Sequence, residues 1–189
     1  MNNVALFSDV SSNPQLKCGV GACLLLSASD LESALQDINR EEIAVRIRFK
    51  RFTATSSTRL EIQTVLWALE QYQGESCGAV PGNLRIYTDS QCLAGLQARR
   101  AGLESRQFLS RRTGQLLANA ALYRAWYAAS DLLGFELVKV AGHSRASSHD
   151  TVQRIFSLVD QEARRALRTW LAESGECERA VLKALTGSC

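Results

Sequence analysis

Hydrophobic and polar positions follow two periods along this chain, and together they predict a mixed α/β fold. Two short apolar runs, at residues 4–7 and 19–26, have the length and composition of buried strands. Residues 44–50 alternate instead, which predicts a half-buried strand with a basic outer face. Its apolar positions are Val45, Ile47 and Phe49, and its basic positions are Arg46, Arg48 and Lys50. We expect these three strands to form an antiparallel meander.

Helical spacing dominates the rest of the chain. A stripe of Ile62, Val65, Leu66 and Leu69 predicts a helix over 58–73. Further helices are expected to begin within 89–97 and to span 113–132 and about 151–171, with buried strands at 84–88 and 135–140. This order implies a five-stranded mixed sheet, with three antiparallel strands first and two parallel strands after them, flanked by helices.

Two segments stand apart from this scheme. Residues 28–42 are acidic and predict a short helix or a structured loop between the second and third strands, with Ser29 and Glu32 spaced as a capping box. Residues 173–189 form a tail that could add one short helix. We therefore expect one domain over 1–172, carrying the acidic insertion, followed by that tail.

Composition narrows the class of protein. The 189 residues are 46% hydrophobic and 22% charged with a net charge of +3, which is typical of a single folded domain rather than a disordered chain. The N-terminal residues lack the pattern of a secretory signal, and no apolar run is long enough for a membrane helix. The six scattered cysteines are therefore expected to be reduced, in a cytoplasmic protein without membrane contact or an evident stable protein partner. With only two histidines, a zinc site has little support.

Four acidic residues are candidates for chemistry. Asp9 and Asp89 each follow an apolar strand, Glu61 lies in the first turn of the helix over 58–73, and Asp160 borders the apolar stripe of the last helix. Each residue alone also fits a structural role: Asp89 as a helix cap, Glu61 as a first-turn acid, and Asp9 or Asp160 as a polar boundary residue. If they converged, they would raise one another's pKa, and divalent cations with oxygen ligands would remove that cost.

The chain resembles type 1 ribonuclease H in five segments that occur in that family's order over residues 3–170. These segments are Phe7-Ser8-Asp9 with Asn13-Pro14 and Gly19-Val20-Gly21-Ala22; Ser57-Thr58-Arg59-Leu60-Glu61; Ile86-Tyr87-Thr88-Asp89-Ser90-Gln91; Val138-Lys139-Val140-Ala141-Gly142-His143; and Val159-Asp160-Gln161-Glu162-Ala163-Arg164-Arg165-Ala166. The resemblance implies an RNase H-like fold that hydrolyses the RNA strand of an RNA–DNA hybrid with two Mg²⁺ ions, for which Mn²⁺ can substitute.

The resemblance also implies roles for individual residues. Asp9, Glu61, Asp89 and Asp160 would be the catalytic metal ligands, with Asp150 as a rival for the last position, and His143 would assist proton transfer or product release. Substrate contacts would come from Ser12, Asn13, Ser57, Arg59, Gln91, Arg99 and Arg100. The arginines around residues 99–112 suit a phosphate backbone, although a solvated charged face would show the same composition.

Departures from the family pattern leave the substrate open. Val10 replaces a glycine, Ser57 and Thr58 replace asparagines, and Phe156 stands where the family has an asparagine. The stretch between His143 and Asp160 is longer than usual. Three hypotheses follow: a hybrid-specific endoribonuclease, a nuclease of the same fold for double-stranded RNA or structured DNA, and a module that binds the hybrid without cutting it.

Overall fold

A five-stranded mixed sheet forms the centre of the protein. The computed structural model describes residues 3–36, 39–75, 83–140 and 151–186. The strands are β1 (Val4–Asn13), β2 (Cys18–Ser27), β3 (Arg48–Phe52), β4 (Leu84–Thr88) and β5 (Glu136–Lys139). They are ordered β3-β2-β1-β4-β5, with antiparallel pairing of β1 with β2 and of β2 with β3, and parallel pairing of β4 with β1 and β5. The predicted fold class is therefore confirmed.

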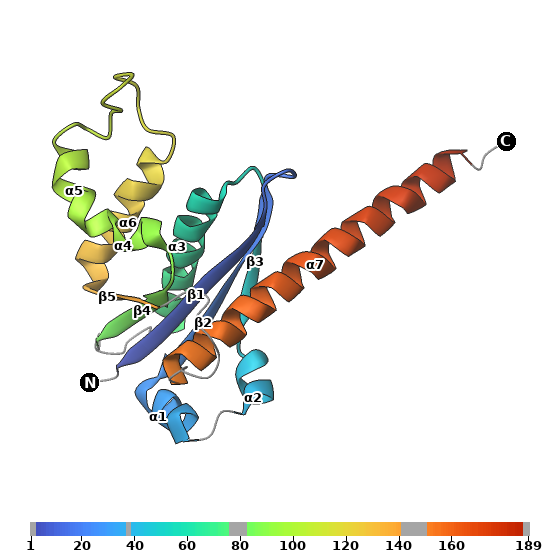
Figure 1. Cartoon of the computed structure of the whole chain (residues 1–189), viewed down its shortest axis with the longest axis horizontal. Coiled ribbons are helices and arrows are strands. Elements are labelled where there is room, and N and C mark those ends of the chain that lie inside the picture. Colours follow the sequence, from blue (N-terminus) through green and yellow to red (C-terminus); the bar gives the residue numbers. More distant parts are fainter. Residues whose placement is uncertain (1–2, 37–38, 76–82, 141–150, 187–189) are drawn as a thin grey trace.

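Helices cover both faces of this sheet (Figure 1). They are α1 (Ala28–Gln36), α2 (Arg40–Ala44), α3 (Ser57–Glu75), α4 (Gln91–Ala94), α5 (Leu96–Glu104), α6 (Ala120–Leu133) and α7 (Thr151–Thr186). Alternate residues of β1 supply the two cores, as strand geometry requires: Leu6 packs with α3 and α6, whereas Ala5 and Phe7 pack with α7. None of the described helices is both long and apolar enough to cross a membrane.

The third strand begins later than its alternation predicts. Asn39 caps α2 by accepting hydrogen bonds from two backbone amides, and the last turn of that helix extends through Val45. Only Ile47 of the predicted inward face is buried, since Val45 is 84% exposed and Phe49 is 42% exposed. β3 starts at Arg48, and its short pairing with β2 leaves it at the sheet edge.

The acidic segment between β2 and β3 forms two helices, and its capping box lies two residues before the predicted one. The Ser27 backbone amide donates to Asp30 Oδ2 at 3.2 Å, and the Asp30 amide donates back to Ser27 Oγ at 3.1 Å. Arg46 donates to the same carboxylate at 2.8 Å. This hydrogen bond is the largest contribution that lowers the pKa of Asp30 to about 2.

The later helices also differ from their predicted bounds. α6 begins at Ala120 rather than at residue 113, because residues 109–117 form a hairpin-like loop closed by a bridge between Leu109 and Leu116. The last helix does not end at residue 171. α7 continues without a break to Thr186, so the tail expected from residue 173 is part of this helix as far as it is described, and its C-terminal part projects beyond the sheet (Figure 1).

Two glycines of β2 let α3 approach the sheet closely. A Cβ atom on Gly21 would lie 2.1 Å from Thr64 Oγ1, and one on Gly19 would lie 2.4 Å from Leu60 Cδ2 and 2.7 Å from the Ser11 carbonyl oxygen. Leu60 and Thr64 are fully buried on α3. The distance between α3 and β2, and with it the position of the first turn of α3, therefore depends on these glycines.

We predict that Gly21→Ala destabilises the protein by about 2 kcal/mol, because the added methyl group overpacks the contact between α3 and β2. The matched control is Gly74→Ala near the end of α3, where nothing lies within 4 Å of an added Cβ and alanine favours the helix. Urea unfolding of both variants checks this expectation. Equal stability of the two variants would show that the contact yields without cost.

Candidate active site

Asp9 and Asp89 lie on neighbouring strands, just past the point where these strands stop pairing. The parallel pairing of β1 with β4 joins Val4–Phe7 to Leu84–Tyr87 and goes no further. Asp89 is the first residue after β4, and Asp9 lies two residues beyond the paired part of β1. β1 itself does not end there, as the apolar run suggested, but continues to Asn13 in pairing with β2. The two carboxylates therefore lie at one edge of the parallel part of the sheet.

The helix cap after β4 is Ser90, not Asp89. Ser90 Oγ accepts a hydrogen bond from the Leu93 amide at 3.1 Å, and the Ser90 amide donates to Thr88 Oγ1 at 3.2 Å. These contacts satisfy the start of α4 without the aspartate. The alternative reading of Asp89 as an N-cap is therefore wrong, and its carboxylate is left for another role.

Glu61 reaches this edge from the first turns of α3. Ser90 Oγ donates to Glu61 Oε2 at 2.6 Å, so one serine hydroxyl joins α3 to the start of α4. Asp9, Glu61, Asp89 and Ser90 all line one small, shallow surface depression. The structure thus brings together three of the four predicted acidic residues around a single surface depression.

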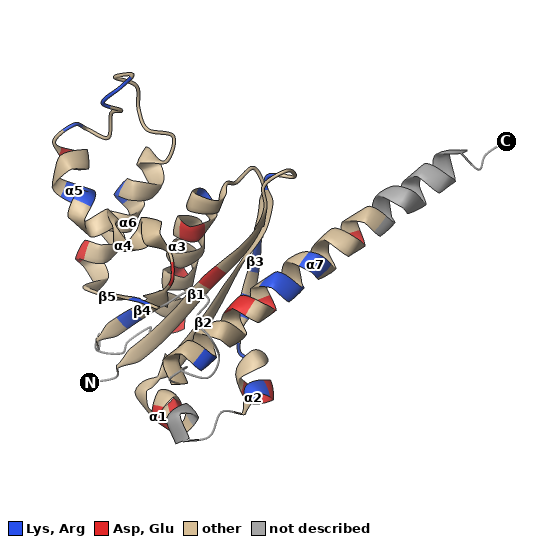
Figure 2. Ribbon diagram, in the orientation of Figure 1, with Lys and Arg blue, Asp and Glu red and all other residues tan. Residues whose placement is uncertain are grey.

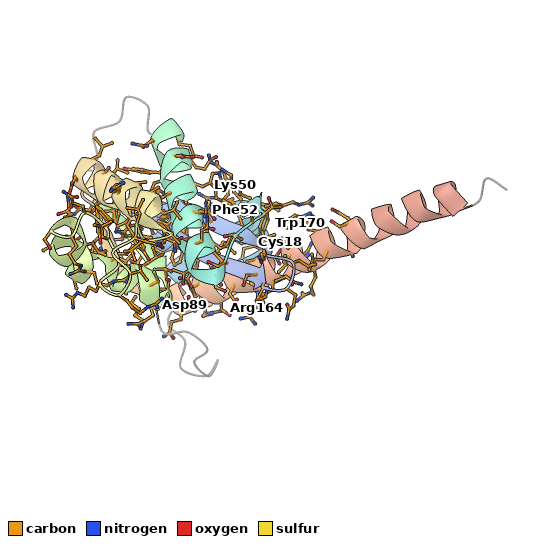
Figure 3. All side chains as sticks on the ribbon, turned by 90° about the horizontal axis from the view of Figure 1, so that it is seen from above. Cys18, Lys50, Phe52, Asp89, Arg164 and Trp170 are labelled. Carbon is orange, nitrogen blue, oxygen red and sulfur yellow. The ribbon has the colours of Figure 1, made fainter. Side chains whose placement is uncertain are left out.

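Asp160 completes the group from the opposite layer. It lies on α7 between the fully buried residues Val159 and Ala163, which pack on the sheet and fix that turn of the helix. Its carboxylate is one of the nearby charges that raise the pKa of Asp9, and its Oδ1 accepts from Arg164 Nε at 2.7 Å. Asp160 of α7 therefore lies next to Asp9, which lines the depression together with Glu61 of α3 and Asp89 at the end of β4. Asp89 and Arg164 are labelled on this side of the molecule in Figure 3.

The surroundings of Asp9 and Glu61 disfavour the charged forms of both carboxyl groups. Burial is the main cause that raises the pKa of Asp9 to about 8, and the charges of Asp89 and Asp160 raise it further, against a lowering hydrogen bond from the Val10 amide. Burial also raises the pKa of Glu61, with a smaller contribution from Asp89, while the Ser90 hydroxyl lowers it. A bound cation would relieve this mutual repulsion.

The chemistry of the donors suits a divalent cation, since four carboxyl groups offer hard oxygen ligands and two of them are shifted toward protonation. Their present arrangement is not that of a closed coordination shell. Within the described ranges, no three His, Cys, Asp or Glu side chains are grouped closely enough to hold a metal ion. Ser90 holds Glu61 and Arg164 holds Asp160, so these two carboxyl groups are engaged by protein donors.

The predicted substrate-contacting residues fall into three groups. Ser12 and Ser57 lie together, with their hydroxyl oxygens 3.3 Å apart, and Arg59 is exposed in the same helical turn as Ser57. Asn13 Oδ1 instead accepts from the Leu16 amide at 3.1 Å, and Gln91 Oε1 accepts from Lys139 Nζ. These two side chains therefore have internal partners.

Arg99 and Arg100 have structural partners that the sequence did not predict. Arg99 donates to the carbonyl oxygens of Gly95 and Cys92, both at 3.0 Å. Arg100 forms ion pairs with Glu104 and Asp131 and lies over the Tyr127 ring. Both stay predictions as substrate contacts. His143 and the rival ligand Asp150 lie outside the described residues, so their roles stay predictions too.

Sequence reasoning missed Ser90 and Arg164 as part of the site. For Ser90 the signal was present: a serine three residues before a buried leucine, at a helix start, is a typical N-cap. For Arg164 it was also present, since an aspartate and an arginine four residues apart share one face of a helix. Spacing alone does not tell which of several charged neighbours forms the ion pair with Asp160.

Comparison with known proteins supports the fold. No protein-family model matches the chain, and the search of curated proteins finds no match. Among solved structures, the RNase H domain of PFV, a foamy virus, is 10% identical with a TM-score of 0.57, over 87% of this chain and 92% of that one. LC9-RNase H1, described as a type 1 RNase H with the type 2 active-site motif, is 19% identical with a TM-score of 0.56, over 86% and 72%.

A third similar structure is the foamy viral protease-reverse transcriptase in complex with an RNA/DNA hybrid. It is 11% identical with a TM-score of 0.53, over 86% of this chain but only 20% of that longer one. At such identities the likeness establishes architecture and not activity. The chain has an RNase H-like fold, in agreement with the resemblance noted in its sequence.

The raised pKa of Asp9 predicts how stability depends on pH. In the presence of a chelator, the unfolding temperature should fall between about pH 4 and pH 8, because the folded protein keeps a proton on Asp9 that the unfolded chain has released. Asp9→Asn should reduce this slope and raise the unfolding temperature most near pH 8. Thermal unfolding followed by circular dichroism across this range measures the effect.

Asp30→Asn serves as the control for this measurement. The hydrogen-bond partners of Asp30 lower its pKa to about 2, so this residue loses its contribution to stability only below about pH 4. Asp30→Asn should therefore keep the wild-type dependence of the unfolding temperature on pH between pH 4 and pH 8. A slope for Asp9→Asn equal to that of the wild type would contradict the raised pKa.

Proposed function

We propose that this protein is a metal-dependent endoribonuclease that hydrolyses the RNA strand of RNA–DNA hybrids. One observation carries the proposal: within an RNase H-like fold, Asp9, Glu61 and Asp89 line the same depression, and the charges of Asp89 and Asp160 both raise the pKa of Asp9. A binding module would gain nothing from gathering four carboxyl groups that repel one another. A site for divalent cations, in contrast, would use these carboxyl groups as oxygen ligands, and the cations would remove the repulsion.

The acidic side chains are proposed to hold two Mg²⁺ ions, or Mn²⁺ in their place. When bound, such ions would supply charge neutralisation and an activated water for phosphodiester hydrolysis. Asp9, Asp89 and Asp160 would provide ligands from three separate elements, and Glu61 would join them on release from Ser90. His143, just after β5, is proposed to assist proton transfer or product release.

The surface around the site offers contacts for a hybrid. The paired hydroxyls of Ser12 and Ser57 lie on the hairpin of β1 and β2 and at the start of α3, and Arg59 is exposed two residues after Ser57 on α3. Hydroxyl groups of this kind suit the wide minor groove of a hybrid, which displays the 2′-hydroxyls that distinguish RNA from DNA. Ser12, Ser57 and Arg59 are therefore the substrate contacts that the geometry supports best.

A basic surface lies on the loop between α5 and α6. Arg111 and Arg112 are exposed at its tip, where Ser110 and Gln115 close a tight turn by a backbone hydrogen bond of 2.8 Å. Figure 2 shows the blue segments of this loop standing away from the sheet. No ion pair between described residues includes either arginine, in contrast to Arg100. These two side chains are proposed to contact phosphates.

The test of the activity is cleavage of an end-labelled RNA–DNA hybrid with Mg²⁺ or Mn²⁺, beside single-stranded RNA, duplex RNA and duplex or structured DNA. Wild-type protein is expected to cut only the RNA strand of the hybrid. Asp89→Asn should lower the rate at least about 100-fold, since it removes a ligand from the site. Asp30→Asn, an equal substitution at the start of α1, should keep the rate, because Asp30 pairs with Arg46 at the end of β1 and β2 opposite to Asp9.

Other outcomes would redirect the proposal. Cutting of duplex RNA or structured DNA instead of the hybrid would keep the nuclease but change its substrate. Hybrid binding without metal-dependent products, from folded protein, would favour a binding module. Unchanged cleavage by Asp89→Asn would remove the site from the reaction altogether.

The proposed phosphate contacts make a separate prediction. Arg111→Gln and Arg112→Gln should each weaken hybrid binding and reduce the dependence of log K on log salt by about one. Arg85→Gln is the control, because it removes the same charge from the sheet at an exposed ion pair with Glu136. Filter binding at several salt concentrations measures the slopes. An effect of Arg85→Gln equal to that of the loop variants would assign the change to net charge alone.

A further inference from the structure

Asp160 has two neighbours of opposite character. Its negative charge acts on the nearby Asp9, and its Oδ1 accepts a hydrogen bond from Arg164 Nε at 2.7 Å. Among the residues that the structure describes, this is the one ion pair that includes any of the four acidic side chains of the site. Arg164 therefore supplies the direct positive partner of the acidic group.

The Arg164 guanidinium contacts the Asp160 carboxylate that a bound cation would use as a ligand. Asp160 and Arg164 are four residues apart on α7, so they share one face of the helix, and Val159 and Ala163 on the neighbouring buried face hold this part of the helix against the sheet. The Asp160 side chain is 21% exposed, whereas the Arg164 side chain is 47% exposed. The arginine therefore reaches the carboxylate from the solvent side and has room to swing away.

A guanidinium does not lose its proton in a protein, so its charge leaves Asp160 only when the side chain moves. A cation that takes Asp160 as a ligand then meets an oxygen that is already neutralised by a donor from its own helix. Binding must displace Arg164 or share the carboxylate with it, and either event weakens the binding of that cation.

We propose that Arg164 is a positioning residue that acts as an internal counterion for Asp160 and competes with the cation bound there. The inference rests on the proposed metal site. In this arrangement Arg164 holds Asp160 in place when no ion is bound, and it raises the metal concentration at which the Asp160 side of the site fills. The same contact opposes the repulsion between Asp160 and Asp9 in the metal-free protein.

The experiment measures Mn²⁺ binding to the free, full-length protein by isothermal titration calorimetry, without nucleic acid. Of the two proposed ions, the one bound at Asp160 is expected to bind more weakly. Arg164→Gln is expected to bind this Mn²⁺ ion about three- to five-fold more tightly than the wild type does, which is the effect expected of one partly exposed ion pair. It should also lower the unfolding temperature in a chelator and show a larger increase on Mn²⁺ addition. Arg164→Lys, which keeps the charge, should bind Mn²⁺ much as the wild type does.

Arg165→Gln is the matched control. Arg165 is the next residue on α7, its side chain is 72% exposed, and its ion-pair partner is Glu162 at 3.4 Å rather than a residue of the site. It should leave the Mn²⁺ affinity at the wild-type value, which separates competition at Asp160 from the loss of one positive charge on the helix.

The outcomes distinguish this inference from the proposed function. Equal Mn²⁺ affinities of Arg164→Gln and Arg165→Gln, with clear binding to the wild type, would overturn the competition and keep the metal site. Weaker binding by folded Arg164→Gln would likewise overturn it. If wild-type protein and all three variants bound no Mn²⁺ and the hybrid stayed uncut, the metal site and this inference would both be wrong.

Discussion

The pairing of β1 with two neighbours of opposite direction is the constraint on which the rest of the structure depends. β1 pairs with β2 over all ten of its residues but with β4 only over Val4–Phe7. Beyond that point β4 turns into α4 while β1 continues. Asp9 of β1 and Asp89 at the end of β4 lie where the two strands separate. The helices on the two faces of the sheet add Glu61 from α3 and Asp160 from α7.

Much of this arrangement could be predicted from the sequence, because periodicity reports burial directly. The strand at 84–88 and the helix over 58–73 appear as expected, since each combines a clear apolar pattern with clear polar ends. The third strand was misplaced because residues 44–47 alternate like a strand yet belong to the end of α2 and its turn, where the Asn39 cap decides the backbone. Local hydrogen bonding outweighed hydrophobic pattern there.

The capping box and the site show the same limit of sequence reasoning. Ser27 and Asp30 have the same spacing as Ser29 and Glu32, and the true pair is selected by the strand end before it and by Arg46, a distant residue. The four acids could be named from their order along the chain. That Ser90 and Arg164 engage two of them depends on which donors the fold places within hydrogen-bond distance, and no periodicity carries that information.

The serine between α3 and α4 has a consequence for how the protein tolerates mutation. Ser90 uses its single proton toward Glu61 and a lone pair toward the Leu93 amide. Folding of the short helix and placement of the acid therefore share one oxygen atom. Threonine preserves both bonds, whereas alanine, cysteine or glycine lose at least one of them. Selection for a stable helix start alone would thus be enough to maintain the position of Glu61, even in a descendant that no longer used it for chemistry.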